Sequence, residues 1–283
     1  ALRTLLALGA SLGPLACFAQ QPAKLARIGY LGVGSESDSA ERVTILKSGL
    51  RDLGYADGKN ITFEMRWADG VYKRLPDLAA DLARLKVDVI VAIAPPGGRA
   101  AKQATATIPI VILAGDGVAS GLVASLARPG GNITGMTFFS PELSAKRVEL
   151  LKDAMPRVTK MAVLLNPENF FFAYNLQAMQ VTAKTLKLEL HQFPAREPRE
   201  FEGAFTAMVK QRVGALAVIE DGMLNVNPGA IADLAAKHRL PAAGNREFAV
   251  AGGLVGYGVN LPEAHRRLAA FVDKILRGAK PAA

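Results

Sequence analysis

The chain has 283 residues, half of them hydrophobic, and a formal net charge of +9. This length allows one large domain or two of ordinary size, with enough apolar residues for a sizeable core. Basic residues alternate with acidic ones in stretches such as RVELLKDAMPR, which is typical of solvated helix faces, and no basic run is interleaved with aromatic residues. We therefore expect no nucleic acid partner.

The first 19 residues, ALRTLLALGASLGPLACFA, have one positive charge, an apolar middle and small residues before Gln20. This layout is typical of a secretory signal peptide, so residues 1–19 predict export. Lipid attachment at Cys17 is the alternative, but Pro14 stands where a large aliphatic residue is usual. Cys17 is the one cysteine of the chain, so the mature protein would have no disulfide, thiolate metal site or cysteine nucleophile.

Apolar strands alternate with helices after the leader. Val87–Ala94 is rich in β-branched residues, and the Pro95–Gly98 turn separates it from a helix that we expect to begin near Gly98. A second strand ends at Gly115 before a short helical stretch. Five strands are predicted over 27–33, 60–67, 87–94, 109–114 and 132–138, with helices over 40–53 and 75–85. These elements make a complete α/β half.

The same pattern then restarts, with Ser140 as the cap of a helix that has Pro141 in its first position. Strands are predicted over 160–165, 188–193, 215–219, 240–243 and 254–256, and helices over 141–156, 170–186, 201–212, 227–237 and 261–276. We therefore predict two α/β lobes, 20–139 and 140–258, with 259–283 as a helix at their interface. Small ligands bind preferentially in clefts between such lobes, beyond the carboxyl ends of the strands.

Long segments of the chain resemble a known family. They include GYADGKNITFEMRWADG, GDGVASGLVASLARPGGNITG and AAKHRLPAAGNREFAVAGGLVGYGVNLPEAHRRLAAFVDKILRGAKP, and together they cover nearly all of 54–281. The family is that of the periplasmic substrate-binding proteins of ABC transporters, which includes binders of tryptophan and other aromatic amino acids. The resemblance implies a type I periplasmic-binding-protein fold with two Rossmann-like lobes that close on a ligand. We also expect a monomer without cofactor that works in the periplasm with an ABC permease of the inner membrane.

Three features depart from the family pattern. Asp116 is followed by Gly117 where the family has proline, and the turn after the third strand reads Pro95-Pro96-Gly97-Gly98-Arg99 instead of Thr-Pro-Ala. The family also continues with a further strand beyond the position of Ala283, so we expect the chain to be truncated there. The first two departures fall where a ligand would contact the first lobe.

An amino acid ligand is a zwitterion, which requires donors for its carboxylate and acceptors for its ammonium group. Pro96, Gly97 and Gly98 permit close backbone approach to a carboxylate at a helix N-terminus, although the same turn could simply join a strand to a helix. Arg99 could add a bidentate contact or point to solvent. Asp116 could accept from the ammonium group or form an Asx turn or helix cap.

Other polar candidates come from both lobes. In the first loop Ser35 and Ser37 could reach over the ligand, whereas Asp38 or Ser39 is expected to cap the following helix. The candidates at strand ends of the second lobe are Asn166, Asn169, Asp221 and Asn245. One aromatic residue within 170–174 could wall the pocket, which would suit a flat or apolar ligand.

Motifs of enzymes are weak. Gly32-Val33-Gly34 lacks the acidic partner of a nucleotide-binding fingerprint, and GASLG, which matches GxSxG, lies in the leader. The three histidines have no metal-ligand spacing and are interpreted as surface or helix-face residues: His191, His238 and His265. We expect no catalytic residue and no metal. The alternatives are an exported α/β enzyme acting on a small carboxylate and the ligand-sensing domain of a receptor.

Overall fold

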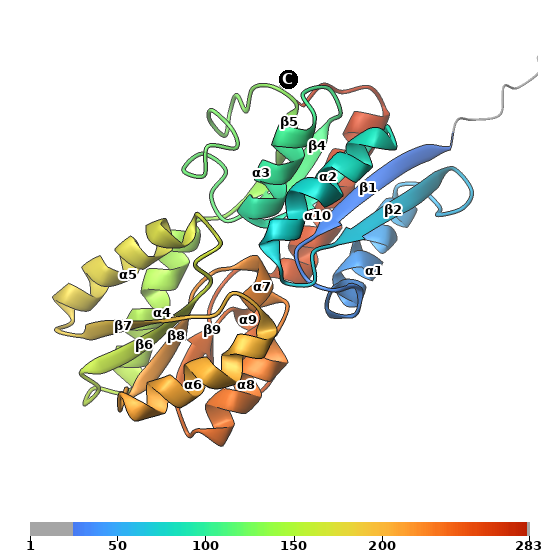
Figure 1. The fold of residues 1–283 in the computed structure, drawn as a ribbon. Helices are drawn as coiled ribbons and strands as arrows, with labels where there is room; N and C mark the ends of the chain where they lie inside the picture. The colour runs from blue at the N-terminus through green and yellow to red at the C-terminus, as the bar shows by residue number, and fades with distance from the viewer. Residues whose placement is uncertain (1–24, 282–283) are drawn as a thin grey trace, which may run out of the picture.

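Two five-stranded parallel sheets, each flanked by helices, form the two lobes of the computed structural model, which describes residues 25–281 (Figure 1). The strand order is β2-β1-β3-β4-β5 in the N-terminal lobe and β10-β9-β8-β6-β7 in the C-terminal lobe. Every pairing between neighbouring strands is parallel. The predicted architecture of two Rossmann-like lobes is confirmed.

The strands are β1 (Ala26–Gly32), β2 (Ile61–Trp67), β3 (Val89–Ile93), β4 (Ile110–Ala114), β5 (Ile133–Thr137), β6 (Lys160–Leu165), β7 (Glu189–Pro194), β8 (Ala215–Val218), β9 (Ala242–Gly244) and β10 (Val255–Gly256). The helices are α1 (Glu36–Asp52), α2 (Leu75–Arg84), α3 (Ala94–Ala104), α4 (Ser140–Ala154), α5 (Phe172–Thr185), α6 (Phe201–Lys210), α7 (Gly222–Asn225), α8 (Pro228–Lys237), α9 (Arg246–Val250) and α10 (Leu261–Leu276). Two 3-10 turns, η1 (Tyr72–Arg74) and η2 (Pro198–Glu200), precede α2 and α6.

The last helix completes the first lobe. α10 packs against α1 and contacts β3 and β4, and its apolar stripe, with Leu268 and Val272 fully buried, belongs to the same core cluster as Ile28 of β1. We expected this helix at the lobe interface. Its first turn does line the cleft, through Leu261 and His265, while the rest lies in the core of the N-terminal lobe.

Several elements differ from the prediction. α1 begins at Glu36, because Ser35 rather than Asp38 or Ser39 is its N-cap. α3 begins at Ala94, because proline is well tolerated in a first helical turn, where amide hydrogens have no intrahelical acceptor. The segment after Gly117 forms turns instead of a helix, and the four-residue helix α7 was not predicted.

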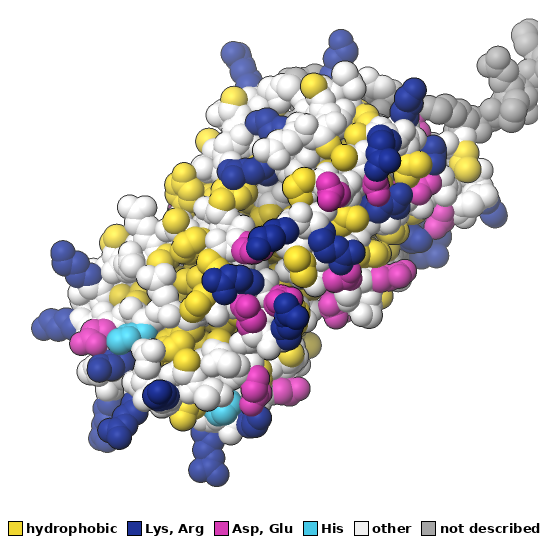
Figure 2. Space-filling model, viewed as in Figure 1, with side chains coloured by type: hydrophobic (Ala, Val, Ile, Leu, Met, Phe, Trp, Pro, Cys, Tyr) yellow, Lys and Arg dark blue, Asp and Glu magenta, His cyan; other side chains and the backbone are white. Residues whose placement is uncertain are grey.

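The surface carries mixed charge. Acidic and basic side chains are interspersed across the middle of the face seen in Figure 2, and Lys and Arg side chains project from both ends of the molecule. Within residues 25–281, no helix combines the length and the apolarity needed to cross a membrane. The predicted signal peptide, residues 1–19 with Cys17, lies outside the described residues.

Candidate ligand-binding cleft

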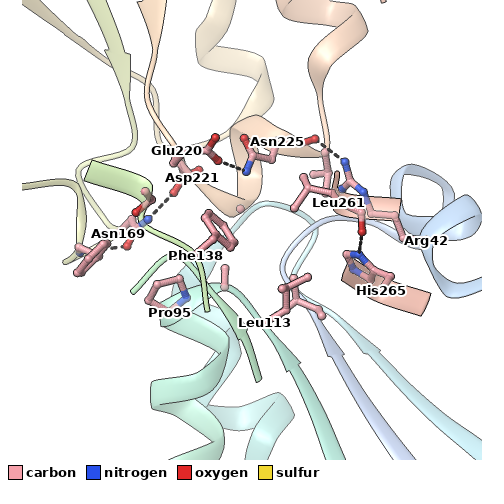
Figure 3. Close-up of a pocket in the computed structure, with 17 residues that line it drawn as sticks. Arg42, Pro95, Leu113, Phe138, Asn169, Glu220, Asp221, Asn225, Leu261 and His265 are labelled. Carbon is pink, nitrogen blue, oxygen red and sulfur yellow. Dashed lines mark hydrogen bonds between the residues drawn. The ribbon is translucent and has the colours of Figure 1, made fainter. Parts of the chain in front are cut away.

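A cavity lies between the lobes, beyond the carboxyl ends of β3, β4 and β8 (Figure 3). The volume open to the centres of water molecules is about 50 Å³, enough for a few waters. Seventeen residues from both lobes line it: Arg42, Ile93, Ala94, Pro95, Leu113, Gly115, Phe138, Ser140, Asn169, Phe171, Glu220, Asp221, Gly222, Asn225, Val226, Leu261 and His265. The lobes are therefore closed on each other around a narrow space.

Asp221 is a buried carboxylate in the wall of this cavity, with 3% of its surface exposed. Its Oδ1 accepts from the amides of Met223 and Leu224, so it caps α7. Its Oδ2 accepts from Asn169 Nδ2 and from the hydroxyl of Tyr72, each at 2.9 Å. All four donors are neutral, and burial raises the pKa of Asp221 above its ordinary value despite them.

Tyr72 links the lobes at this point. It belongs to the N-terminal lobe, and its hydroxyl donates to Asp221 and accepts from the amide of Met223 at 2.9 Å. Burial and then the charge of Asp221 raise the pKa of Tyr72 well above its ordinary value, which keeps the hydroxyl protonated as a donor. These hydrogen bonds form only when the lobes are closed, because Tyr72 lies in one lobe and its two partners lie in the other.

Two further contacts join the lobes outside the cavity lining. The Lys73 ammonium group lies 3.2 Å from Glu168, and the Arg99 guanidinium lies over the ring of Phe170 at 3.0 Å from its centroid. Lys73 is 80% exposed, so solvent and salt weaken that ion pair. Arg99, which makes this cation–π contact, does not line the cavity described above.

A buried ion pair lies in the C-terminal lobe next to the cavity. Arg147 of α4 has no exposed surface, and its guanidinium donates to the carbonyls of Val218 and Tyr257 and to Glu220. The other carboxylate oxygen of Glu220 accepts from Asn225 Nδ2 at 2.7 Å. The charge of Glu220 is thus balanced within the lobe, whereas Asp221 forms no ion pair with any described residue.

Arg42 of α1 and His265 of α10 lie together at one end of the cavity, and Asn169 and Asp221 lie at the other (Figure 3). Arg42 donates to the carbonyl of Asn225 at 2.7 Å, a further hydrogen bond between the lobes. Burial lowers the pKa of His265 to about 4, so its ring is neutral at physiological pH. His265 is 2% exposed and lies on the buried face of α10, so of the two predicted positions, surface or helix face, the helix face is right.

The backbone is strained where β3 meets α3. Ala94 has φ +62°, a left-handed conformation that costs a residue with a side chain about 1–2 kcal/mol. Its methyl group is buried against the cavity and faces Gly222 of the other lobe. Backbone strain of this kind concentrates at functional sites, where surrounding structure holds it in place.

The predicted residues of the first loop and fourth strand lie outside the cavity lining. Ser35 accepts from the amide of Asp38 as the N-cap of α1, and its hydroxyl lies 2.9 Å from that of Ser37. Asp116 accepts from the amides of Val118 and Ala119, which is the Asx-turn alternative. Their roles in ligand binding stay predictions.

The glycine turn is buried and does not contact the cavity. Pro96, Gly97 and Gly98 are the third to fifth residues of α3, and none of them lines the cavity, whereas Pro95 does. Gly98 packs against Leu122 of the same lobe. Two of the first four residues of α3 are prolines, so this N-terminus offers fewer free amide hydrogens to an anion than a turn beginning at Gly98 would.

The four predicted residues of the second lobe are all buried, but only two of them line the cavity. Asn169 and Asp221 meet in the cavity. Asn166 accepts from the amide of Glu168, and Asn245 caps α9; neither lines the cavity. Of the aromatic residues 170–174, Phe171 lines it. It is stacked on Tyr174 at 4.9 Å.

Sequence reasoning missed Arg42, Tyr72 and His265. A signal existed for His265, because it stands four residues after Leu261 and three before Leu268 on the apolar stripe of a helix. A polar residue on such a stripe is expected to be buried, and a buried polar group requires a hydrogen-bond partner. Among residues 25–281, no group of three potential metal ligands occurs.

Two parallel α/β lobes that close around a cavity, with polar side chains at its two ends and apolar ones between them, have the architecture of a solute-binding protein of the periplasmic type. The family comparison agrees. The model of the ABC transporter substrate binding protein family matches residues 35–283, and the chain belongs to this family.

Several known proteins are similar to this chain in sequence or in fold. A tyrosine-binding protein of Clostridioides difficile (strain R20291) is 28% identical over 232 residues, which cover 81% of this chain and 66% of that protein. The chain thus spans just under two thirds of the length of this relative. A conserved domain protein of Vibrio cholerae has a TM-score of 0.82 and 26% identity, over 92% of this chain and 87% of that one. An ABC domain of Streptococcus pneumoniae in complex with L-Trp has a TM-score of 0.80 and 22% identity, over 91% and 87%.

Proposed function

We propose that this protein is the periplasmic solute-binding component of an ABC importer and captures an amino acid, with aromatic ones favoured, between its lobes. It would be exported and deliver the closed form to a permease of the inner membrane. It would catalyse no reaction, because its work is differential binding: a ligand favours the closed state only through contacts that it makes there.

The observation that carries this proposal is Asp221, a buried carboxylate that faces the cavity and has no cationic partner among the described residues. Neutral donors leave its charge uncompensated in a site of low polarity, so a cation placed there is strongly favoured. The ammonium group of an amino acid would supply that cation. Asn169 lies beside it and would orient the same end of the ligand.

The middle of the cavity suits an apolar side chain. Pro95, Leu113 and Phe138 lie between the two polar ends (Figure 3), and Phe171 adds an aromatic wall. These surfaces favour a flat or aromatic group. The relatives are consistent with this, since one is a tyrosine-binding protein and another was solved with L-Trp.

A ligand of this size needs more room than the closed cavity has, so we propose that it enters when the lobes part. A thermal-shift screen over amino acids, organic acids and sugars tests the assignment. A ligand at a hundred times its dissociation constant adds about 2.7 kcal/mol to the free energy of unfolding. If no zwitterion shifts the melting temperature while a sugar or an organic acid does, the amino acid assignment is wrong.

A further inference from the structure

One buried acceptor in the cavity wall has no partner. Of the described residues that line the cavity, His265 alone has a buried side-chain nitrogen or oxygen without a hydrogen bond, its Nε2. Nδ1 lies 2.8 Å from the carbonyl oxygen of Leu261. A carbonyl can only accept, so Nδ1 carries the hydrogen and Nε2 presents a bare lone pair. Leaving such an atom unpaired is unfavourable unless a ligand supplies the donor.

The donor that His265 lacks must come from an uncharged group. Arg42 lies at the same end of the cavity (Figure 3), and its charge, after burial, helps to lower the pKa of His265. The same positive potential repels an ammonium group. Asp221, at the opposite end, attracts it. The zwitterionic end of an amino acid is therefore directed away from His265, and the side chain toward it.

Arg42 also has N–H donors that form no hydrogen bond with the described residues. It donates one hydrogen bond, to the carbonyl of Asn225, and forms no ion pair within the described part of the chain. A guanidinium has five N–H donors, so several remain for an acceptor on the ligand. This end of the cavity thus combines a cationic donor with a neutral acceptor.

A hydroxyl group matches both requirements, because it accepts from Arg42 and donates to His265 Nε2. A carboxylate would satisfy Arg42 alone, an indole N–H would satisfy His265 alone, and a hydrocarbon would satisfy neither. We propose that His265, together with Arg42, is a specificity-determining residue that selects ligands with a hydroxyl group on an aromatic or apolar side chain. This proposal rests on the proposed function, since it assigns the other end of the ligand to Asp221.

The test measures L-tyrosine and L-phenylalanine, which differ by one hydroxyl, by isothermal titration calorimetry. We expect the unaltered protein to bind L-tyrosine at least tenfold more tightly, because a site built to hydrogen-bond a hydroxyl leaves its own polar groups unpaired with the analogue. In His265→Leu the preference falls to within about threefold, mainly through weaker tyrosine binding. His265→Gln keeps an acceptor and retains part of the preference.

The ratio of the two affinities is independent of the fraction of folded protein, so a destabilised variant still gives a valid measure of the preference for L-tyrosine. His238→Leu is the matched control, because His238 also has a buried Nε2 without a hydrogen bond but packs on Phe205 in the C-terminal lobe. It should leave the ratio unchanged. Equal binding of the two amino acids by the unaltered protein, or a preference that survives in His265→Leu, overturns the proposal.

A second pair of ligands separates this proposal from the amino acid assignment. The compounds are 3-(4-hydroxyphenyl)propionate and 3-phenylpropionate, which lack the ammonium group. A preference for the hydroxylated acid that is lost in His265→Leu supports the role of His265 even if no amino acid binds. If amino acids bind without regard to the hydroxyl, the proposed function stands and the role of His265 is refuted. Binding of none of the four ligands overturns both.

Discussion

The hydroxyl of Tyr72 donates to Oδ2 of Asp221 at 2.9 Å across the cleft, although 149 residues separate them in the chain. The same hydroxyl accepts from the amide of Met223. One oxygen of the N-terminal lobe therefore bridges a carboxylate and an amide of the C-terminal lobe. The closed arrangement and the electrostatics of the ligand site depend on the same atom.

Tyr72→Phe should weaken ligand binding, because it removes this bridge and leaves the amide of Met223 without that acceptor. Loss of such a hydrogen bond costs about 1–2 kcal/mol, roughly a five- to thirtyfold increase in Kd. Calorimetry measures it. Tyr55→Phe is the control, since Tyr55 donates to Asp273 within the N-terminal lobe. An equal loss of affinity in both variants would mean that Tyr72 acts through general stability.

Asp221→Asn should remove the preference for a ligand with an ammonium group. The comparison is between L-tyrosine and its des-amino analogue, 3-(4-hydroxyphenyl)propionate. A buried charged partner contributes about 2–5 kcal/mol when one side of the pair is truncated, so the preference should fall by at least tenfold. Asp116→Asn, which alters an Asx turn outside the cavity, should retain it. Retention of the preference in Asp221→Asn would refute the electrostatic role of Asp221.

Arg147→Met should lower the free energy of unfolding by about 3–5 kcal/mol, because it leaves the carboxylate of Glu220 buried without its cation. Urea unfolding measures this loss. The double variant Arg147→Met, Glu220→Gln removes both charges and should recover part of it. If the double variant were less stable by the sum of the two single losses, the two side chains would not be coupled.

Stability should fall as the pH decreases from about 6.5 to about 4, because the unfolded chain binds a proton at His265 in this range and the folded protein does not. The contribution of His265 to the free energy of unfolding is fully present above about pH 6.5, the pKa of histidine in the unfolded chain, and amounts to about 3 kcal/mol. Asp221 acts in the opposite direction, since its raised pKa favours the folded state at low pH.

Urea unfolding across this pH range tests the assignment to His265. His265→Gln should flatten the dependence, whereas His191→Gln, at a half-exposed histidine, should preserve it. An unchanged slope in His265→Gln would assign the pH dependence to other groups.

Ala94→Gly should be neutral or slightly stabilising, because glycine adopts a positive φ without the steric cost that Ala94 bears. Ala92→Gly, two residues earlier in the buried strand β3, should cost about 1 kcal/mol. Thermal unfolding of both variants gives the difference, which we expect to be at least about 1 kcal/mol. Equal destabilisation would show that the conformation of Ala94 is not strained.

The fold could be predicted because each lobe repeats a local pattern. Fully buried parallel strands read as continuous apolar runs, as in Val89–Ile93 and Ile110–Ala114, and α10 was predicted with both its limits because its apolar stripe is regular. The start of α3 was missed because two prolines read as a turn when their neighbours in space are unknown. In a first helical turn they are compatible with the helix.

The site was only partly predictable for a different reason. Residues at strand ends, such as Asn169 and Asp221, follow from topology, since the carboxyl ends of parallel strands converge. Arg42 and His265 lie within helices, and their approach to the cavity depends on how α1 and α10 pack against each other. That packing brings together residues 223 positions apart, and no local pattern encodes it.

The place of α10 in the N-terminal lobe also sets an order of events in folding. The apolar face of α1, with Leu46 and Leu50, is covered by a helix that ends at Leu276. A chain that emerges from its first residue onward, from a ribosome or through a translocation pore, must leave this face uncovered until the whole second lobe has been delivered. The first lobe to appear is thus the last to be completed, and contacts so distant in sequence make its folding slow.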